Sequence, residues 1–140
     1  MRISAFVAVA LFAAAPALAA SMPMDTPTDI GSVNAVCTGV GSAENDPRWT
    51  AYPVRVVFSN GGAQFLSGVH LTLNQDGKTL ATVDCDGPWV LLKLPKGDYR
   101  VTATLTGQPG GKPHSADFST SGMGAQQRVE IQFPKVEANQ

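Results

Sequence analysis

Two cysteines, Cys37 and Cys85, are the residues of this 140-residue chain whose chemistry is easiest to predict. They lie far apart in the sequence, so they form neither the Cys-x-x-Cys motif of redox pairs nor a cluster of four zinc ligands. In an exported protein, two such cysteines pair most simply with each other. We therefore predict a Cys37–Cys85 disulfide and keep a redox or metal-binding pair as the alternative.

Soft sulfur and nitrogen donors also occur, in Met22, Met24, His70 and His114. Thioether and imidazole groups suit copper(I), which is the chemistry that these residues would support. The methionines, however, fall in a proline-containing segment with little periodicity, and His70 falls on the polar face of its expected strand. His114 follows a proline in an expected loop. We interpret them as unrelated exposed side chains and predict no metal and no cofactor.

The run His114, Ser115 and Asp117 has the residue types of a hydrolytic triad. A triad depends on arrangement in space rather than on sequence proximity, and the chain has no Gly-x-Ser-x-Gly elbow to expose a nucleophilic serine. We predict that the protein is not an enzyme. An enzyme with a dispersed site is the least favoured alternative.

Trp49, Tyr52 and Trp89 carry the remaining chemistry, because aromatic rings stack on sugars and anchor protein partners. Tyr52 and Trp89 lie in or beside expected strands, where filling the ends of the core is the alternative role. Trp49 lies in a segment without strand periodicity and is the best candidate for an exposed ring. These three residues form the predicted binding set.

Charge excludes two classes of partner. The chain has ten basic and eleven acidic residues, a formal net charge of −1 at pH 7. Binding to nucleic acid usually requires a basic stripe, and adhesion to anionic lipid requires a basic surface. We therefore expect no nucleic acid partner and no electrostatic membrane binding.

The first twenty residues have the parts of a secretory signal peptide. Arg2 supplies the positive charge, and Ala17, Leu18 and Ala19 give the small-x-small cleavage pattern after an apolar stretch of about 15 residues. That stretch is shorter than the roughly 20 residues that span a bilayer, and no later stretch is long enough. We predict removal of residues 1–20, a periplasmic or secreted location, and no membrane insertion after removal.

Short segments of period-two alternation must position these side chains. The clearest segment has Tyr99, Val101 and Ala103 on one face, with polar residues between them, as in an antiparallel strand with one buried face. Similar alternation occurs in residues 52–58, 69–73 and 129–133. Residues 89–94 are more continuously apolar, which is expected of a central strand buried on both faces.

Turn signals separate these segments, most clearly the Asp-Gly pair at residues 76–77, which predicts a hairpin. About seven short strands without an amphipathic helix predict an all-β sandwich. We place this sandwich at residues 37–134, between a flexible N-terminal leader (21–36) and a C-terminal tail (135–140).

Three motifs then suggest a family. The chain has Gly-Val-x-Leu-x-Leu at residues 68–73, Asp-Gly-Lys at 76–78 and Leu-Pro-x-Gly-x-Tyr-x-Val at 94–101. Together they resemble the carboxypeptidase regulatory-like domain over roughly residues 53–133. The resemblance implies a seven-stranded antiparallel β-sandwich of the transthyretin (prealbumin) type. The Asp-Gly-Pro-Trp run at 86–89 is similar to that of small, exported, single-domain bacterial proteins of this type.

Such a fold hosts many roles, so the resemblance does not assign one. We expect a non-catalytic exported module that serves as an interaction or accessory protein of the bacterial periplasm or cell envelope. Its partner would be an unidentified envelope protein, engaged through a sheet edge. The alternative is a binding protein for a glycan or peptide, which would use the exposed aromatic rings.

Overall fold

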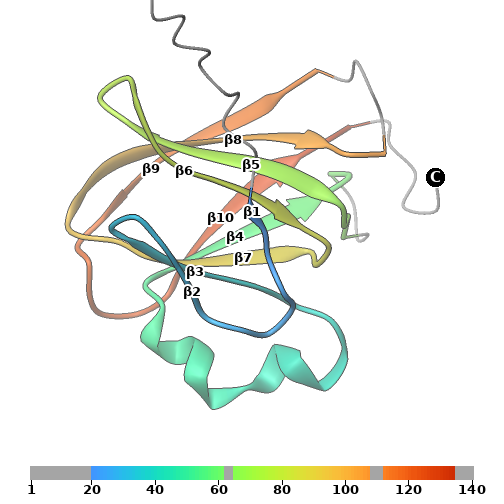
Figure 1. Ribbon diagram of the computed structural model, residues 1–140, viewed down its shortest axis with the longest axis horizontal. Coiled ribbons are helices and arrows are strands. Elements are labelled where there is room, and N and C mark those ends of the chain that lie inside the picture. The colour runs from blue at the N-terminus through green and yellow to red at the C-terminus, as the bar shows by residue number, and fades with distance from the viewer. Residues whose placement is uncertain (1–19, 62–64, 108–111, 135–140) are drawn as a thin grey trace, which may run out of the picture.

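The computed structural model describes residues 20–61, 65–107 and 112–134, which form two facing β-sheets with no α-helix among them (Figure 1). The predicted signal peptide (1–20) lies outside the described residues except for Ala20, and so does the predicted tail (135–140). Among the described residues, no helix is long and apolar enough to cross a membrane.

Each sheet has five strands, in the order β1-β6-β5-β8-β9 for sheet A and β10-β4-β7-β3-β2 for sheet B. The strands of sheet A are β1 (Ala20–Ser21), β5 (Val69–Gln75), β6 (Lys78–Cys85), β8 (Gly97–Leu105) and β9 (His114–Thr120). Those of sheet B are β2 (Thr28–Ile30), β3 (Val33–Thr38), β4 (Val54–Ser59), β7 (Trp89–Lys93) and β10 (Gln127–Gln132).

The all-β, sandwich-like prediction is confirmed, but the predicted seven strands with purely antiparallel pairing are wrong in detail. The described residues contain ten strands, because β1, β2 and β3 lie in a stretch that has no readable alternation. Two pairings are parallel, namely β1 with β6 and β10 with β4. The second involves the edge strand β10 of sheet B, which the chain reaches by crossing from β9, the neighbouring edge strand of sheet A.

Alternating apolar residues from both sheets form the core, as their period predicts. Each inward strand face contributes fully buried side chains, among them Val56 of β4, Leu71 of β5 and Val101 of β8. Burying each such side chain stabilises the fold by roughly 1.5–3 kcal/mol. The predicted hairpin joins β5 to β6, where Asp76 and Gly77 both have positive φ, of 51° and 76°. Two successive residues with positive φ are the signature of a tight hairpin turn.

The flexible leader predicted for residues 21–36 is wrong, because this segment belongs to the sandwich. β3 pairs with β7 in the interior of sheet B, and Met22 is only 5% exposed. The alternation is hidden because both faces of β3 are covered: Ala35 faces the main core, and Val36 lies beneath a second layer on the outside. A strand buried on both faces has no polar side to reveal its period.

The predicted disulfide is confirmed, and it joins the two sheets. Cys37 of β3 in sheet B is bonded to Cys85 of β6 in sheet A, and both residues are buried. The nearby Met24, whose Sδ lies 3.4 Å from Cys37 Sγ, packs against the core as well. The bridge therefore fastens the side of the sandwich where the N-terminal segment passes from β1 to β2.

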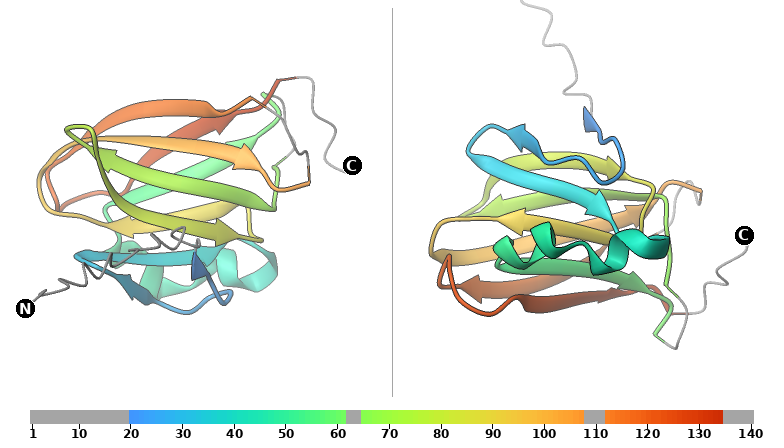
Figure 2. Two further views of the ribbon diagram at one scale, coloured as in Figure 1. Left: turned by 45° about the horizontal axis from the view of Figure 1, so that its top comes forward. Right: turned by 90° about the horizontal axis from the view of Figure 1, so that it is seen from below.

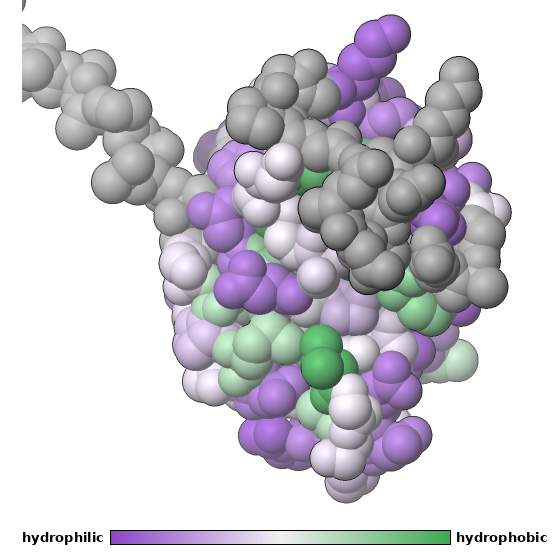
Figure 3. Space-filling model, turned by 90° about the vertical axis from the view of Figure 1, so that its right-hand side faces the viewer, coloured by the Kyte–Doolittle hydropathy of each residue, from purple (hydrophilic) through white to green (hydrophobic). Residues whose placement is uncertain are grey.

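The outer faces of the two sheets differ. Two 3-10 helices, η1 (Gly41–Asn45) and η2 (Pro47–Ala51), cross the outside of sheet B (Figure 2). Among the described residues, no such helix covers the outer face of sheet A, which carries exposed polar side chains. On the side of the molecule that Figure 3 shows, the surface of the described residues is mostly polar, with small apolar areas. The large apolar side chains that are exposed are Val40, Phe65 and Met123.

Candidate functional site

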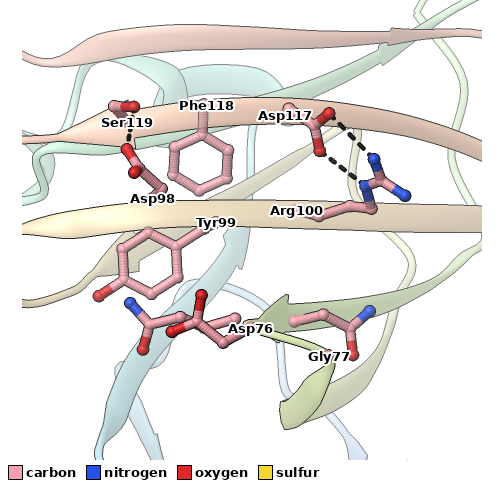
Figure 4. Close-up of a pocket in the computed structure, with 10 residues that line it drawn as sticks. Asp76, Gly77, Asp98, Tyr99, Arg100, Asp117, Phe118 and Ser119 are labelled. Atoms are coloured by element: carbon pink, nitrogen blue, oxygen red, sulfur yellow. Dashed lines mark hydrogen bonds and ion pairs between the residues drawn. The ribbon is translucent and has the colours of Figure 1, made fainter.

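A shallow concavity of about 900 Å³ lies on sheet A, between the turn of the β5–β6 hairpin and the neighbouring parts of β8 and β9 (Figure 4). Because side chains alternate along each strand, every second residue of β8 and β9 projects outward here. The lining residues are Asn74, Gln75, Asp76, Gly77, Asp98, Tyr99, Arg100, Asp117, Phe118 and Ser119.

An ion pair forms one side of this concavity. Arg100 and Asp117 are directly opposite each other on β8 and β9, and Arg100 donates from Nε to Oδ1 at 2.6 Å and from Nη2 to Oδ2 at 3.1 Å (Figure 4). The hydrogen bonds from Arg100 hold the pKa of Asp117 below its ordinary value, and they raise the pKa of Arg100. Asp117 is therefore fully ionised at neutral pH, which suits a binding surface better than proton transfer.

The rest of the concavity is also internally hydrogen-bonded. Ser119 donates to Asp98 across the same two strands (Figure 4). Beneath them, the rings of Tyr99 and Phe118 stack with centroids 5.6 Å apart, and the Tyr99 hydroxyl donates to the carbonyl of Pro95 at 2.7 Å. Burial raises the pKa of Tyr99. The aromatic rings thus form a nearly covered floor, and the accessible groups are charged or polar.

The residues of the possible hydrolytic triad lie on opposite faces of β9. Ser115 and Asp117 project outward from β9, where Ser115 Oγ lies 2.8 Å from Thr102 Oγ1. His114 projects to the other face and packs edge-on against Phe133, with ring centroids 4.8 Å apart. Adjacent strand residues point to opposite faces, so the histidine cannot activate this serine.

The other candidate donors do not converge either. His70 Nδ1 lies 2.7 Å from Asp84 Oδ1, across β5 and β6. Met22 and Met24, expected in a loose leader, are instead packed against the core near the disulfide. Within the ranges that the structure describes, no group of three or more His, Cys, Asp or Glu side chains is arranged to hold a metal ion.

The predicted binding residues Trp49, Tyr52 and Trp89 all lie on the outer side of sheet B, but they are not an exposed aromatic surface. Trp49 is only 2% exposed, so its expected exposure is wrong. The η2 helix folds it onto the sheet, where it forms a small second core with Tyr52, Val36 and Leu91. Its indole nitrogen donates to the carbonyl of Ala43 at 2.8 Å, which anchors η1 as well.

Each of these aromatic rings has a cation over it. Arg48 lies 4.7 Å from the Trp49 ring centroid, Lys93 5.0 Å from that of Tyr52, and Arg55 4.0 Å from that of Trp89. Such contacts are favourable by about 0.5–1 kcal/mol at exposed sites and by more when desolvated. Tyr52 also donates its hydroxyl to Asn34. The rings therefore serve to pack and to position cations.

Arg55 belongs to a second, smaller pocket of about 340 Å³ under η1 and η2. Its Nε is buried and makes no hydrogen bond with any described residue. Burial is the main cause that lowers the pKa of Arg55, the nearby Arg128 lowers it further, and Glu44 opposes the change. The lining residues are Glu44, Asn45, Asp46, Pro47, Trp49, Thr50, Arg55, Gly124, Ala125 and Gln126.

Sequence reasoning therefore named three aromatic residues that lie together on one face of sheet B. It missed Arg55, the charged residue beside them, and the whole of the sheet A concavity. The signal for Arg55 was present, because it is the only charged residue in an otherwise apolar strand. Asp98, Arg100 and Asp117 gave no comparable signal, since alternating polar residues are ordinary on an exposed sheet face.

Comparison with known proteins adds no relative. No family model matches the chain, and a search of curated proteins finds no match. The fold and the site geometry described above therefore carry the functional argument.

Proposed function

We propose that this protein is a non-catalytic binding module, exported to the bacterial periplasm or cell envelope, where it acts as an interaction or accessory protein. The observation that carries the proposal is the state of the charged groups in the sheet A concavity. Arg100, Asp117, Asp98 and Ser119 are held in cross-strand ion pairs and hydrogen bonds. Groups fixed in this way present an ordered polar surface to a partner, at a small further cost in side-chain entropy.

Export is supported by the buried disulfide between Cys37 and Cys85, because disulfides persist in oxidising compartments. It agrees with the signal peptide expected at residues 1–20. We further propose that the sandwich is of the carboxypeptidase regulatory-like, transthyretin-like type. The support for this is the motif at residues 94–101, whose turn leads into the core strand β8.

Capture experiments with matched variants test the proposal. The protein is immobilised with its disulfide intact and exposed to envelope extract, in parallel with the Asp98→Ala/Arg100→Ala double variant and with Thr82→Ala. Thr82 projects from β6 on the same face but does not line the concavity. We expect a component that wild type and Thr82→Ala retain and that the double variant loses. Equal retention by all three proteins would place binding elsewhere and contradict the proposal.

A small-ligand binding protein, for a glycan or peptide, is the second candidate. The observation in its favour is the pocket under η1 and η2, which brings Trp49 and Arg55 together. Because the ring of Trp49 is covered, we assign ligand recognition in this pocket to polar groups rather than to stacking on exposed aromatic surfaces. An enzyme with a dispersed site stays the least favoured reading.

A further inference from the structure

Arg55 stands beside a like charge, and the acidic group that partly offsets it, the exposed Glu44, forms no ion pair with it. On the outer face of sheet B it is directly opposite Arg128 in the parallel pairing of β4 with β10. No ion pair joins Arg55 to a described residue, and Arg128 has only a long contact to Glu130, at 3.9 Å. A partly buried cation without a hydrogen-bonded partner is costly, so its retention in a packed face requires a reason.

The neighbours of Arg55 restrict its side-chain orientation and the shape of the pocket. Its guanidinium carbon lies 4.0 Å from the centre of the Trp89 ring, which limits the orientations of the side chain. The wall opposite is fixed too, because Gln126 donates from Nε2 to the carbonyls of Trp49 at 2.9 Å and of Tyr52 at 3.1 Å. The pocket is therefore largely formed before a ligand arrives, which lowers the entropic cost of binding.

The charges around the pocket select the class of ligand. Asp46 is already occupied by Arg48, which donates to it from Nη2 at 2.8 Å and from Nε at 3.0 Å. Glu44 is the acidic group that acts on Arg55, and it is exposed at the rim. Glu44 offsets part of the combined charge of Arg55 and its neighbour Arg128, which leaves a net charge of about +1 (2 − 1). That balance favours a singly charged anion over a phosphate, whose higher charge Glu44 would repel. A guanidinium fork matches a carboxylate in shape and charge.

We propose that the pocket beneath η1 and η2 binds a small organic carboxylate, with Arg55 as the anion-recognising residue. This inference rests on the second candidate function, small-ligand binding in this pocket, and names its ligand class. The site is separate from the sheet A concavity, so the inference stands or falls independently of the interaction-module proposal. With a pocket of about 340 Å³, the ligand is a small molecule or the end group of a larger one.

Of the two tryptophans of the chain, Trp49 lines this pocket and Trp89 contacts Arg55, so intrinsic fluorescence reports on the site. The purified protein is titrated with acetate and with N-acetylglycine, and separately with chloride and inorganic phosphate at equal ionic strength. We expect a saturable change with the two carboxylates and none with chloride. A response to chloride equal to that of acetate, or tighter binding of phosphate than of acetate, overturns the proposal.

Variants assign the effect to the pocket. Arg55→Gln should weaken carboxylate binding by at least about tenfold, since it removes charge-assisted hydrogen bonds. Arg100→Gln, on the other sheet, is the matched control and should bind as wild type does. Glu44→Gln changes an exposed side chain that does not support the fold, and it should strengthen binding by about two- to threefold. Wild-type affinity in Arg55→Gln, or weaker binding in Glu44→Gln, overturns the proposal even if other variants fold poorly.

Discussion

Arg100 on sheet A and Arg55 on sheet B are both arginines, but they differ in solvent exposure and in their interaction partners. Each projects from the outer face of a strand, but the side chain of Arg100 is 60% exposed and forms a two-pronged pair with Asp117. Arg55 is partly covered, stacks on Trp89 and has no hydrogen-bonded partner among the described residues. Their pKa values accordingly move in opposite directions: the bond to Asp117 raises that of Arg100, and burial lowers that of Arg55.

The cause of the difference is the cover on sheet B. The outer face of sheet A is exposed to solvent, and its charged residues pair with the residues opposite them on the neighbouring strand. On sheet B, η1 and η2 bring Trp49 and Tyr52 onto the sheet and exclude water from part of it. An exposed charge can be satisfied by solvent or by a neighbour, whereas a covered charge needs a specific partner.

Charge alone is therefore a poor guide to where a β-sandwich binds. The sheet A concavity is the larger of the two described here, yet its Arg100, Asp117 and Asp98 are already held by cross-strand partners. It suits a broad contact in which a partner adds hydrogen bonds to a preformed surface. The sheet B pocket is smaller but contains an arginine whose buried Nε has no hydrogen-bond partner among the described residues, so it suits a single anionic group.

The largest effect should come from the bond that joins the two sheets. Replacing both cysteines, in Cys37→Ala/Cys85→Ala, should lower the free energy of unfolding by about 4 kcal/mol, the chain-entropy value for a loop of this length. The bridge spans 48 residues and links β3 to β6, so both outer faces should lose stability together. Urea unfolding of this variant beside wild type measures the loss. A loss confined to one sheet would show that the sheets unfold separately.

Disrupting the packing of η1 and η2 on sheet B should lower stability more than a substitution on the open face of sheet A. Trp49→Ala deletes the largest member of the second core and should cost about 3 kcal/mol, near the low end for a buried tryptophan because an outer layer can partly collapse. It should also admit water to Arg55 and abolish the proposed carboxylate site. Thr102→Ala, on the open face of sheet A, is the control and should stay within about 0.5 kcal/mol of wild type. Equal losses in the two variants would contradict the role given to the cover.

Most of the fold could be predicted because most strands have one solvent-exposed face, which gives their sequences an alternation of apolar and polar residues. Tyr99, Val101 and Ala103 alternate with polar residues, and β8 forms as expected. β3 escaped prediction because Ala35 and Val36 face two different apolar layers. The parallel pairing of β10 with β4 depends on where the chain crosses between sheets, which no local pattern encodes.

The site was less predictable because it depends on tertiary neighbours. The disulfide followed from composition and compartment, but Trp49 was expected at the surface since its segment lacks strand periodicity. A 3-10 helix packed over a sheet buries a residue without giving it a period of two. The different environments of Arg55 and Arg100 could not be predicted either. The local sequence pattern reveals neither the helices that cover sheet B nor the register that places Asp117 opposite Arg100.

Neutralising each arginine should separate the two environments directly. Arg55→Met keeps an unbranched apolar stem over Trp89 and removes a partly buried charge that has no ion-pair partner and lies beside Arg128. It should therefore raise the free energy of unfolding by about 1 kcal/mol. Arg100→Met removes only an exposed pair and should leave stability nearly unchanged. Thermal and urea unfolding, without added carboxylate, measure both. A clear destabilisation by Arg55→Met would mean that the stack on Trp89 outweighs the missing partner.

The smallest expected effect is the pH response of the sheet A pair. Hydrogen bonds from Arg100 lower the pKa of Asp117 in the folded protein. The pair therefore adds stability above the pKa of an unfolded aspartate, near pH 4, and this contribution disappears as pH falls through the lower folded value. Carboxyl-carbon NMR of Asp117 should show the lowered midpoint, and Arg100→Gln should restore it to the ordinary range.

Arg55 offers the contrast in the same titration. Its lowered pKa belongs to a guanidinium, which stays protonated throughout the acidic range, so the Trp89 environment should not change as Asp117 titrates. Tryptophan fluorescence recorded over the same pH values tests this independence. A change in fluorescence that follows the Asp117 midpoint, while the protein stays folded, would show that the two faces are coupled through the core. The charge on sheet A would then influence the pocket on sheet B, and the two sites could no longer be treated as separate.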